Sequence, residues 1–330
     1  MSEQYIQKEI VGRAPFRYGI SISNLANETN PQYALPEHTE DIMRLLAEAN
    51  MGVEFQIESP EQMQLSLPQN VRPAFVGVHL PIRDVDFLDQ DKRKQSFKYG
   101  LQNIQLAHEL EADYVVMHML TKQEWDRIGH RPEFIAEAKK QMEALVKRGK
   151  NTGYEGRYLF ENLEFPLYPS TASEVLDMNQ WRKELGQSQG IQTGICLDLS
   201  HLWHTGIMIE INRQKGDVMK PYFEDAYASG VSDFSSYLTP LVEEIVSDLD
   251  LIHVTGTHIH QTHLLPRVST AVSNTDRITL NLQQAMQHVA HALTARNKDA
   301  FVINEAHHST YEEMVNSINS VSDFFAHGRT

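Results

Sequence analysis

Cysteine is nearly absent from this sequence, since its 330 residues include only Cys196. A single cysteine excludes an intramolecular disulfide and a cysteine-rich zinc knuckle, and its apolar surroundings predict a place in the core. Long apolar runs are also missing, and the first ten residues are too polar for a signal peptide. We therefore expect a cytoplasmic protein with no membrane partner.

Positive charge is scarce as well. The chain has 29 Lys and Arg against 44 Asp and Glu, a net charge of −15. Such a balance repels a phosphate backbone at long range, so nucleic acid is disfavoured as a partner, although a local basic groove would still permit it. The sequence is instead rich in histidine, with 16 residues, many of them at the ends of apolar runs.

Strand-like apolar segments alternate with amphipathic helical segments along the chain. The strand-like segments are 16–25, 52–57, 74–80, 113–119, 157–162, 195–198, 249–256 and 300–305. The helical segments are 36–50, 91–111, 131–150, 172–185, 234–249, 280–296 and 310–325. Continuously apolar strands are typical of parallel sheets buried on both faces. The pattern predicts an α/β fold, a single-domain (β/α)8 TIM barrel over residues 1–330, with an N-terminal extension (1–14) and an inserted loop or lid (205–233) after the sixth strand.

Polar residues close six consecutive strand-like segments, the third to the eighth. In a TIM barrel these positions face one mouth, where such barrels carry out chemistry. The candidates are His79, His118, Glu161, Asp198 with His201, His253 and Glu305. Taken alone, Asp198 would be explained as the N-cap of a helix and His201 as a surface residue. Recurrence on six strands instead favours a metal centre, because buried carboxylates and imidazoles without partners cost several kcal/mol each.

Seven side chains exceed the usual ligand number of one transition-metal ion, so we expect two or more divalent ions, of zinc, manganese or iron. Glu161 lies midway along the series and is the candidate bridge. His258 and His260, in the loop after the seventh strand, are further candidate ligands. A bridged pair can generate hydroxide near neutral pH. Glu161 and Glu305 can alternatively act as catalytic acid and base at a carbon next to a carbonyl.

These residues, in this order, resemble the xylose isomerase-like TIM-barrel superfamily, and most closely its endonuclease IV branch. In that branch the third and fourth strands end in metal-binding histidines, the fifth in a bridging Glu followed by Asn, the sixth in Cys-hydrophobic-Asp-x-x-His, the seventh in His and the eighth in Glu. The matching residues are His79, His118, Glu161-Asn162, Cys196-Leu-Asp198-Leu-Ser-His201, His253 and Glu305. The resemblance covers nearly the whole chain and implies the barrel and its metals.

Two departures bear on function. The branch carries Asp-x-His after its seventh strand, completing a third metal site, whereas this chain reads Thr257-His258-Ile-His260. The branch also has a DNA-contacting basic residue after its second strand, where this chain reads Glu58-Ser-Pro-Glu61. Both differences lower the expectation of DNA cleavage.

Three activities stay open within the superfamily. The sugar isomerases, epimerases and dehydratases match at Glu161, Asp198, His253 and Glu305, a one-metal set that does not generally need His79 and His118. Endonuclease IV-like enzymes hydrolyse phosphodiesters with two or three metals. A further branch uses several irons to oxidise peptide cysteines in natural-product pathways. We expect the first class, acting on a small, polar, sugar-like or hydroxy-carbonyl substrate; the oligomeric state stays open.

Overall fold

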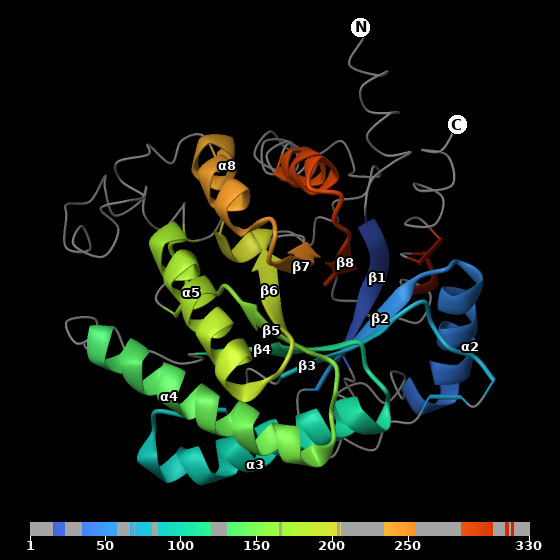
Figure 1. The fold of residues 1–330 in the computed structure, drawn as a ribbon. Helices are drawn as coiled ribbons and strands as arrows, with labels where there is room; N and C mark the ends of the chain where they lie inside the picture. Colours follow the sequence, from blue (N-terminus) through green and yellow to red (C-terminus); the bar gives the residue numbers. More distant parts are fainter. Residues whose placement is uncertain are drawn as a thin grey trace, which may run out of the picture.

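The strands of the computed structural model form a closed, all-parallel barrel in chain order, β1 to β8 (Figure 1). The residues that the structure describes are 16–23, 35–57, 67–68, 70–80, 85–119, 131–164, 167–202, 205, 234–254, 285–305, 314–316 and 318–319. The strands are β1 (Phe16–Ser23), β2 (Gly52–Gln56), β3 (Val76–His79), β4 (Tyr114–Met117), β5 (Arg157–Glu161), β6 (Thr193–Asp198), β7 (Leu249–Val254) and β8 (Ala300–Asn304). The predicted TIM barrel is confirmed.

Helices cover the outside of the barrel (Figure 1). They are α2 (Leu35–Glu48), α3 (Gln90–Glu109), α4 (Arg131–Gly149) with the short η4 (Lys150–Thr152), α5 (Ala172–Gln189), α8 (Phe234–Ile245) and a helix over 285–295. Helices α3, α4 and α5 pack side by side in chain order, and α8 packs on α5. Each therefore buries its apolar stripe against the barrel strands and its neighbours.

Two helices end four residues away from the predicted position, and the other differences are smaller. Helix α5 continues past residue 185 to Gln189 and stops at Gly190, which has a φ of 63°, a left-handed conformation that glycine adopts without steric cost. Helix α8 stops at Ile245, before the predicted residue 249. The chain turns there, and Asp248 N donates to Ile245 O at 2.8 Å, so that β7 can start at Leu249.

An apolar layer fills the middle of the barrel. It consists of Phe75, Tyr114, Val116, Leu159, Cys196, Leu251, Phe301 and Ile303. Glycines opposite the aromatic rings make room for them, since a Cβ on Gly52 would lie 2.3 Å from Phe75 and one on Gly77 would lie 2.3 Å from Tyr114. Cys196 is buried in this layer, as predicted. The layer closes the barrel beneath its carboxyl-terminal mouth.

Some predicted segments lie outside the described residues. These are the N-terminal extension (1–14), the insertion (205–233) apart from Thr205, and most of the closing helix (310–325). Their roles and the single-domain organisation stay predictions. No helix among the described residues is both long enough and apolar enough to cross a membrane.

Candidate metal centre

The alternation of strand side chains places a polar layer directly above the apolar one. On β2 the interior residues are Gly52, Glu54 and Gln56, and β5 follows Leu159 with Glu161. Successive side chains of a strand point to opposite faces, so the residue two steps beyond the apolar layer faces the mouth. The structure brings together six predicted residues at this level: His79, His118, Glu161, Asp198, His253 and Glu305.

Glu161 lies at the centre of this layer and uses its two oxygens on different neighbours. Its Oε1 lies 2.8 Å from Nδ1 of His253. Its Oε2 lies 3.3 Å from Nε2 of His79 and also contacts Nε2 of His118. One carboxylate thus joins the histidines of β3 and β4 to the histidine of β7, an arrangement that suits a bridging ligand.

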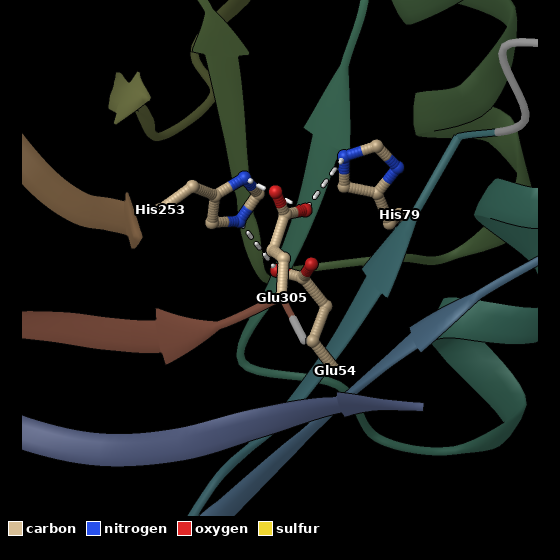
Figure 2. A group of neighbouring side chains, drawn as sticks. All are labelled: Glu54, His79, His253 and Glu305. Carbon is tan, nitrogen blue, oxygen red and sulfur yellow. Dashed lines mark hydrogen bonds and ion pairs between the residues drawn. The ribbon is translucent and has the colours of Figure 1, made fainter. Parts of the chain in front are cut away.

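His253 has a carboxylate on each side of its ring. Nδ1 faces two oxygens, Oε1 of Glu161 and, at 3.2 Å, Oε1 of Glu305. Nε2 faces one oxygen, Oε2 of Glu54, at 3.0 Å. The ring is fully buried. Figure 2 shows His253 and His79 on opposite sides of the Glu305 carboxylate, with Glu54 rising from β2.

The backbone fixes the proton of His79. Its Nδ1 lies 3.0 Å from the carbonyl oxygen of Leu80, and a carbonyl oxygen can only accept, so Nδ1 carries the hydrogen. In the neutral ring, Nε2 then has a lone pair that points at the site, 3.9 Å from Oε1 of Glu305. A histidine whose outer nitrogen donates to the backbone is typical of metal ligands.

Asp198 makes the N-cap contact that the sequence suggested, and its ligand role stays a prediction. Its Oδ1 accepts from the backbone N of His201 at 2.7 Å, as an N-cap does. Its Oδ2 is buried and has no hydrogen-bond partner among the described residues. Asp198 also joins Glu161, His253 and Glu305 in a group whose ligand atoms lie within 4.8 Å of one another. One oxygen is therefore structural, and the other is open to a ligand.

His201 is placed beside this group rather than in it. Its Nδ1 donates to the carbonyl oxygen of Asn162 at 2.9 Å and lies 3.6 Å from Oδ2 of Asp198. None of the metal-competent groups among the described residues includes it. Its possible loop partners, His258 and His260, lie outside the described residues. The ligand roles of all three stay predictions.

Charges inside the layer are balanced by imidazoles. Although burial opposes ionisation, His253 and His118 hold the pKa of Glu161 well below its usual range. Burial raises the pKa of Asp198 to about 7. Burial also opposes the charged form of His201, but the negative charge of Asp198 raises the pKa of His201 to about 9. Without a cation, the imidazoles are thus the main counter-charges of the buried acids.

Sequence reasoning missed two members of the layer, both on β2. Glu54 is fully buried against His253, and Gln56 Nε2 donates to Oε1 of Glu305 at 2.8 Å. Both residues lie inside β2 and do not end an apolar run, so the rule that identified the other candidates does not select them. The period-2 pattern Gly52-x-Glu54-x-Gln56 was the available signal.

Comparison with known proteins establishes the fold. No protein-family model and no curated protein matches the sequence significantly. The chain is similar to a solved structure described as a putative xylose isomerase from Rhodospirillum rubrum ATCC 11170, with a TM-score of 0.58, 11% identity and coverage of 93% of this chain and 99% of the other. A D-tagatose 3-epimerase-like protein gives a TM-score of 0.55 at 16% identity, covering 94% and 98%.

An L-ribulose 3-epimerase gives a TM-score of 0.52 at 14% identity, covering 94% of each chain. The likeness to these structures agrees with the TIM-barrel fold that the sequence pattern predicts. Likeness at such identities defines the class of fold and does not separate its branches.

Proposed function

We propose that the chain is a divalent-metal-dependent enzyme with its centre in the polar layer of the barrel. The proposed ligands are His79, His118, Glu161, Asp198, His253 and Glu305, with His201, His258 and His260 as candidates for a further site. The donor set of carboxylate oxygens and imidazole nitrogens suits zinc, manganese or iron. Oδ2 of Asp198, buried without a hydrogen-bond partner among the described residues, supports the presence of a cation.

A charge count supports two ions rather than one. The layer contains four carboxylates, those of Glu54, Glu161, Asp198 and Glu305. Their summed charge when ionised is 4 × (−1) = −4, and two divalent cations supply 2 × (+2) = +4. With both ions bound, the imidazoles can stay neutral and present lone pairs, as metal binding requires.

The reaction that we propose is isomerisation, epimerisation or dehydration of a small, polar, sugar-like or hydroxy-carbonyl substrate. The observation that carries this proposal is the convergence of Glu161 and Glu305 on the same atom, Nδ1 of His253, at 2.8 and 3.2 Å. Two carboxylates this close can stand on either side of one substrate carbon and transfer its proton. The names of the similar structures, two epimerases and a xylose isomerase, agree with sugar chemistry.

A divalent ion held by Glu161, Asp198, His253 and Glu305 would supply polarisation of the hydroxy-carbonyl oxygens of the substrate. One of the two glutamates takes the proton from the carbon next to the carbonyl, and the other returns a proton to the substrate. Gln56 holds Glu305 in place by donating to its Oε1. The apolar layer underneath keeps water from entering through the barrel.

Proton exchange with solvent tests this proposal. Purified protein, stripped of metal and reloaded separately with Zn²⁺, Mn²⁺ or Fe²⁺, is incubated in deuterium oxide with a panel of ketoses, aldoses and hydroxy acids. Deuterium should enter the substrate at the carbon next to the carbonyl. Glu161→Gln and Glu305→Gln should each abolish exchange, lowering its rate by a factor of at least about 10³, because either change removes the acid–base group.

The matched control is Glu109→Gln on the outer face of α3, where Glu109 is exposed and accepts a hydrogen bond from Gln105. It should exchange at the wild-type rate. Exchange that persists in both Glu161→Gln and Glu305→Gln would remove their acid–base role. Failure of the wild type to exchange with every metal and substrate would end the isomerase proposal.

Phosphodiester hydrolysis is the second candidate, and a specific contact favours it. His79 and His118 both meet Oε2 of Glu161, and these three residues form a metal-competent group of their own. Sugar isomerases of this superfamily do not generally need these histidines. A second ion held by His79, His118 and Glu161 would supply the Lewis acid that phosphodiester hydrolysis needs.

Nicking of a duplex with one abasic site separates the two candidates. A hydrolase should cleave this duplex, lose the activity to a chelator, and lose it in His79→Ala and His118→Ala. Under the isomerase proposal, the same two variants keep measurable deuterium exchange. Absence of nicking at high enzyme concentration, with each of the three metals, would exclude this second function.

A further inference from the structure

Glu54 has no place in the ligand set predicted from the sequence, yet it contacts that set at its centre. Its carboxylate is fully buried on β2, and Oε2 lies 3.0 Å from Nε2 of His253. Burying a carboxylate costs several kcal/mol unless a partner compensates. Among the described residues, His253 brings an imidazole nitrogen within hydrogen-bond distance of this carboxylate, and a contact at the centre of the ligand set calls for a functional explanation.

The two nitrogens of His253 have different surroundings. Nδ1 faces Oε1 of Glu161 and Oε1 of Glu305, which belong to a proposed ligand group with Asp198. Nε2 lies 3.0 Å from Oε2 of Glu54, the carboxylate that faces this nitrogen among the described residues. A neutral imidazole has one N–H and one lone pair, so the group that accepts the N–H decides which nitrogen is available to a cation.

We propose that Glu54 is a positioning residue: it accepts the Nε2–H of His253 and thereby makes Nδ1 the nitrogen that binds metal. The inference rests on the proposed metal centre and deepens it. A carboxylate behind a metal-ligating histidine fixes the ring orientation and raises the basicity of the ligand. Glu54 then acts through His253 without touching the substrate.

The residue below Glu54 fits this role. Tyr114, in the apolar layer, is fully buried. Burial raises the pKa of its phenol well above the usual range, and the charge of Glu54 adds to the effect. The phenol therefore stays protonated. Tyr114, Glu54 and His253 therefore follow one another from the apolar layer toward the site.

The alternative assignment makes Glu54 a metal ligand. Glu54 does form a metal-competent group with His79, His253 and Glu305 (Figure 2). In that arrangement the cation would take Nε2, and Nδ1–H would donate to Glu161 or Glu305. The positioning role is favoured because Nδ1 faces two ligand carboxylates and Nε2 faces one. The two assignments predict opposite tautomers of His253.

Nitrogen NMR of the Zn²⁺-loaded protein, labelled with ¹⁵N-histidine, reads the tautomer directly. His253→Asn identifies the resonance. We expect a metal-bound Nδ1 and a protonated Nε2. In Glu54→Leu this signature should be lost, and the Zn²⁺ affinity, measured by competition with a chromophoric chelator, should fall about 10–100-fold. In Glu54→Gln the amide oxygen can still accept from Nε2–H, so the tautomer should be retained and the affinity largely recovered.

Ser21→Ala is the matched control. Ser21 lies opposite Glu54 on the neighbouring strand, is buried, and its hydroxyl has no hydrogen-bond partner among the described residues. The variant should bind Zn²⁺ as the wild type does. A protonated Nδ1 in the wild type would overturn the positioning role, as would unchanged Zn²⁺ affinity and tautomer in folded Glu54→Leu.

Failure of the proposed function has a different signature. The wild type would then bind none of the three metals. An Nε2–H donated to Glu54 in that metal-free protein would make the contact purely structural and overturn the positioning role too. Should Glu54→Leu not fold, the comparison of Glu54→Gln with wild type still decides the tautomer. A Gln variant in which Nδ1 is protonated and Zn²⁺ affinity is unchanged would contradict the proposal.

Discussion

The acids at the two ends of the barrel have different kinds of partner. At the amino-terminal end, Asp248 lies 2.6 Å from Arg182 and 2.7 Å from Lys183, and Asp250 lies 3.3 Å from both Arg157 and Lys298. At the carboxyl-terminal end, within the described part of the chain, the nearest counter-charges are imidazoles. One end has permanent cations built into the chain, whereas the other has groups whose charge depends on pH and on metal.

We infer from this difference that the amino-terminal end contributes mainly to stability and the carboxyl-terminal end mainly to function. Lysine and arginine remain charged at any physiological pH, so the amino-terminal pairs hold strands and helices together throughout the physiological pH range. Imidazoles release protons near neutrality and accept metals. The carboxyl-terminal end of the barrel, whose counter-charges are imidazoles, can therefore bind a cation from solution. The apolar layer between the two ends makes their contributions independent, so we expect the effects of changes at the two ends to add.

The largest effect on folding is expected at the amino-terminal end, from Arg182→Ala. Its guanidinium is buried and also donates to Asn179 Oδ1 and, at 2.8 Å, to Thr193 O. Removing one partner of a buried pair is strongly destabilising; because Lys183 stays beside Asp248, we expect a loss of about 3 kcal/mol in the free energy of unfolding. Urea denaturation of wild type and variant measures this change in the free energy of unfolding. Metal affinity at 25 °C should be unchanged, and a change there would break the independence of the two ends.

Metal binding should stabilise only through the carboxyl-terminal end. Zn²⁺ at about 100 times its dissociation constant should raise the free energy of unfolding by about 2.7 kcal/mol, because it binds the folded state. Glu161→Ala should lose this stabilisation, and Arg182→Ala should keep it. Thermal unfolding with and without Zn²⁺ makes the comparison. Equal stabilisation of wild type and Glu161→Ala would place the metal elsewhere.

The smallest effect concerns acid stability. Burial tends to raise the pKa of Asp248, but its bonds from Lys183 and Arg182 lower the pKa below the usual value. A carboxyl whose folded pKa is depressed adds stability above its unfolded pKa, and this contribution is lost as pH falls through the folded pKa. Asp248→Asn should therefore be less stable than wild type at pH 7, with the difference shrinking toward pH 3. Urea unfolding across this range checks it, and a constant difference would contradict the assignment.

Most of the fold could be read from the sequence, because most of the parallel strands are buried on both faces and so appear as mainly apolar runs. The ends of those runs also revealed His79, His118 and His253. Glu54 escaped notice because its charge lies inside a strand, where position relative to the barrel axis, rather than distance from the end of a run, decides which way it points. Helix ends such as Ile245 depend on the hydrogen bonds of the following turn, which periodicity does not encode.

Asn162 ties β5 to β6 just beyond Glu161. Its Nδ2 donates to the carbonyl oxygen of Asp198 at 2.8 Å, and its Oδ1 accepts from the backbone N of Asp198 at 2.8 Å. The side chain thus makes two hydrogen bonds to the main chain of β6, as the backbone of one further residue of β5 would. The spacing between the carboxylates of Glu161 and Asp198 is consequently locked by main-chain geometry. An engineer who wished to fit a larger or smaller ion would have to change side-chain lengths around the pocket, since the frame that carries these two acids cannot slide.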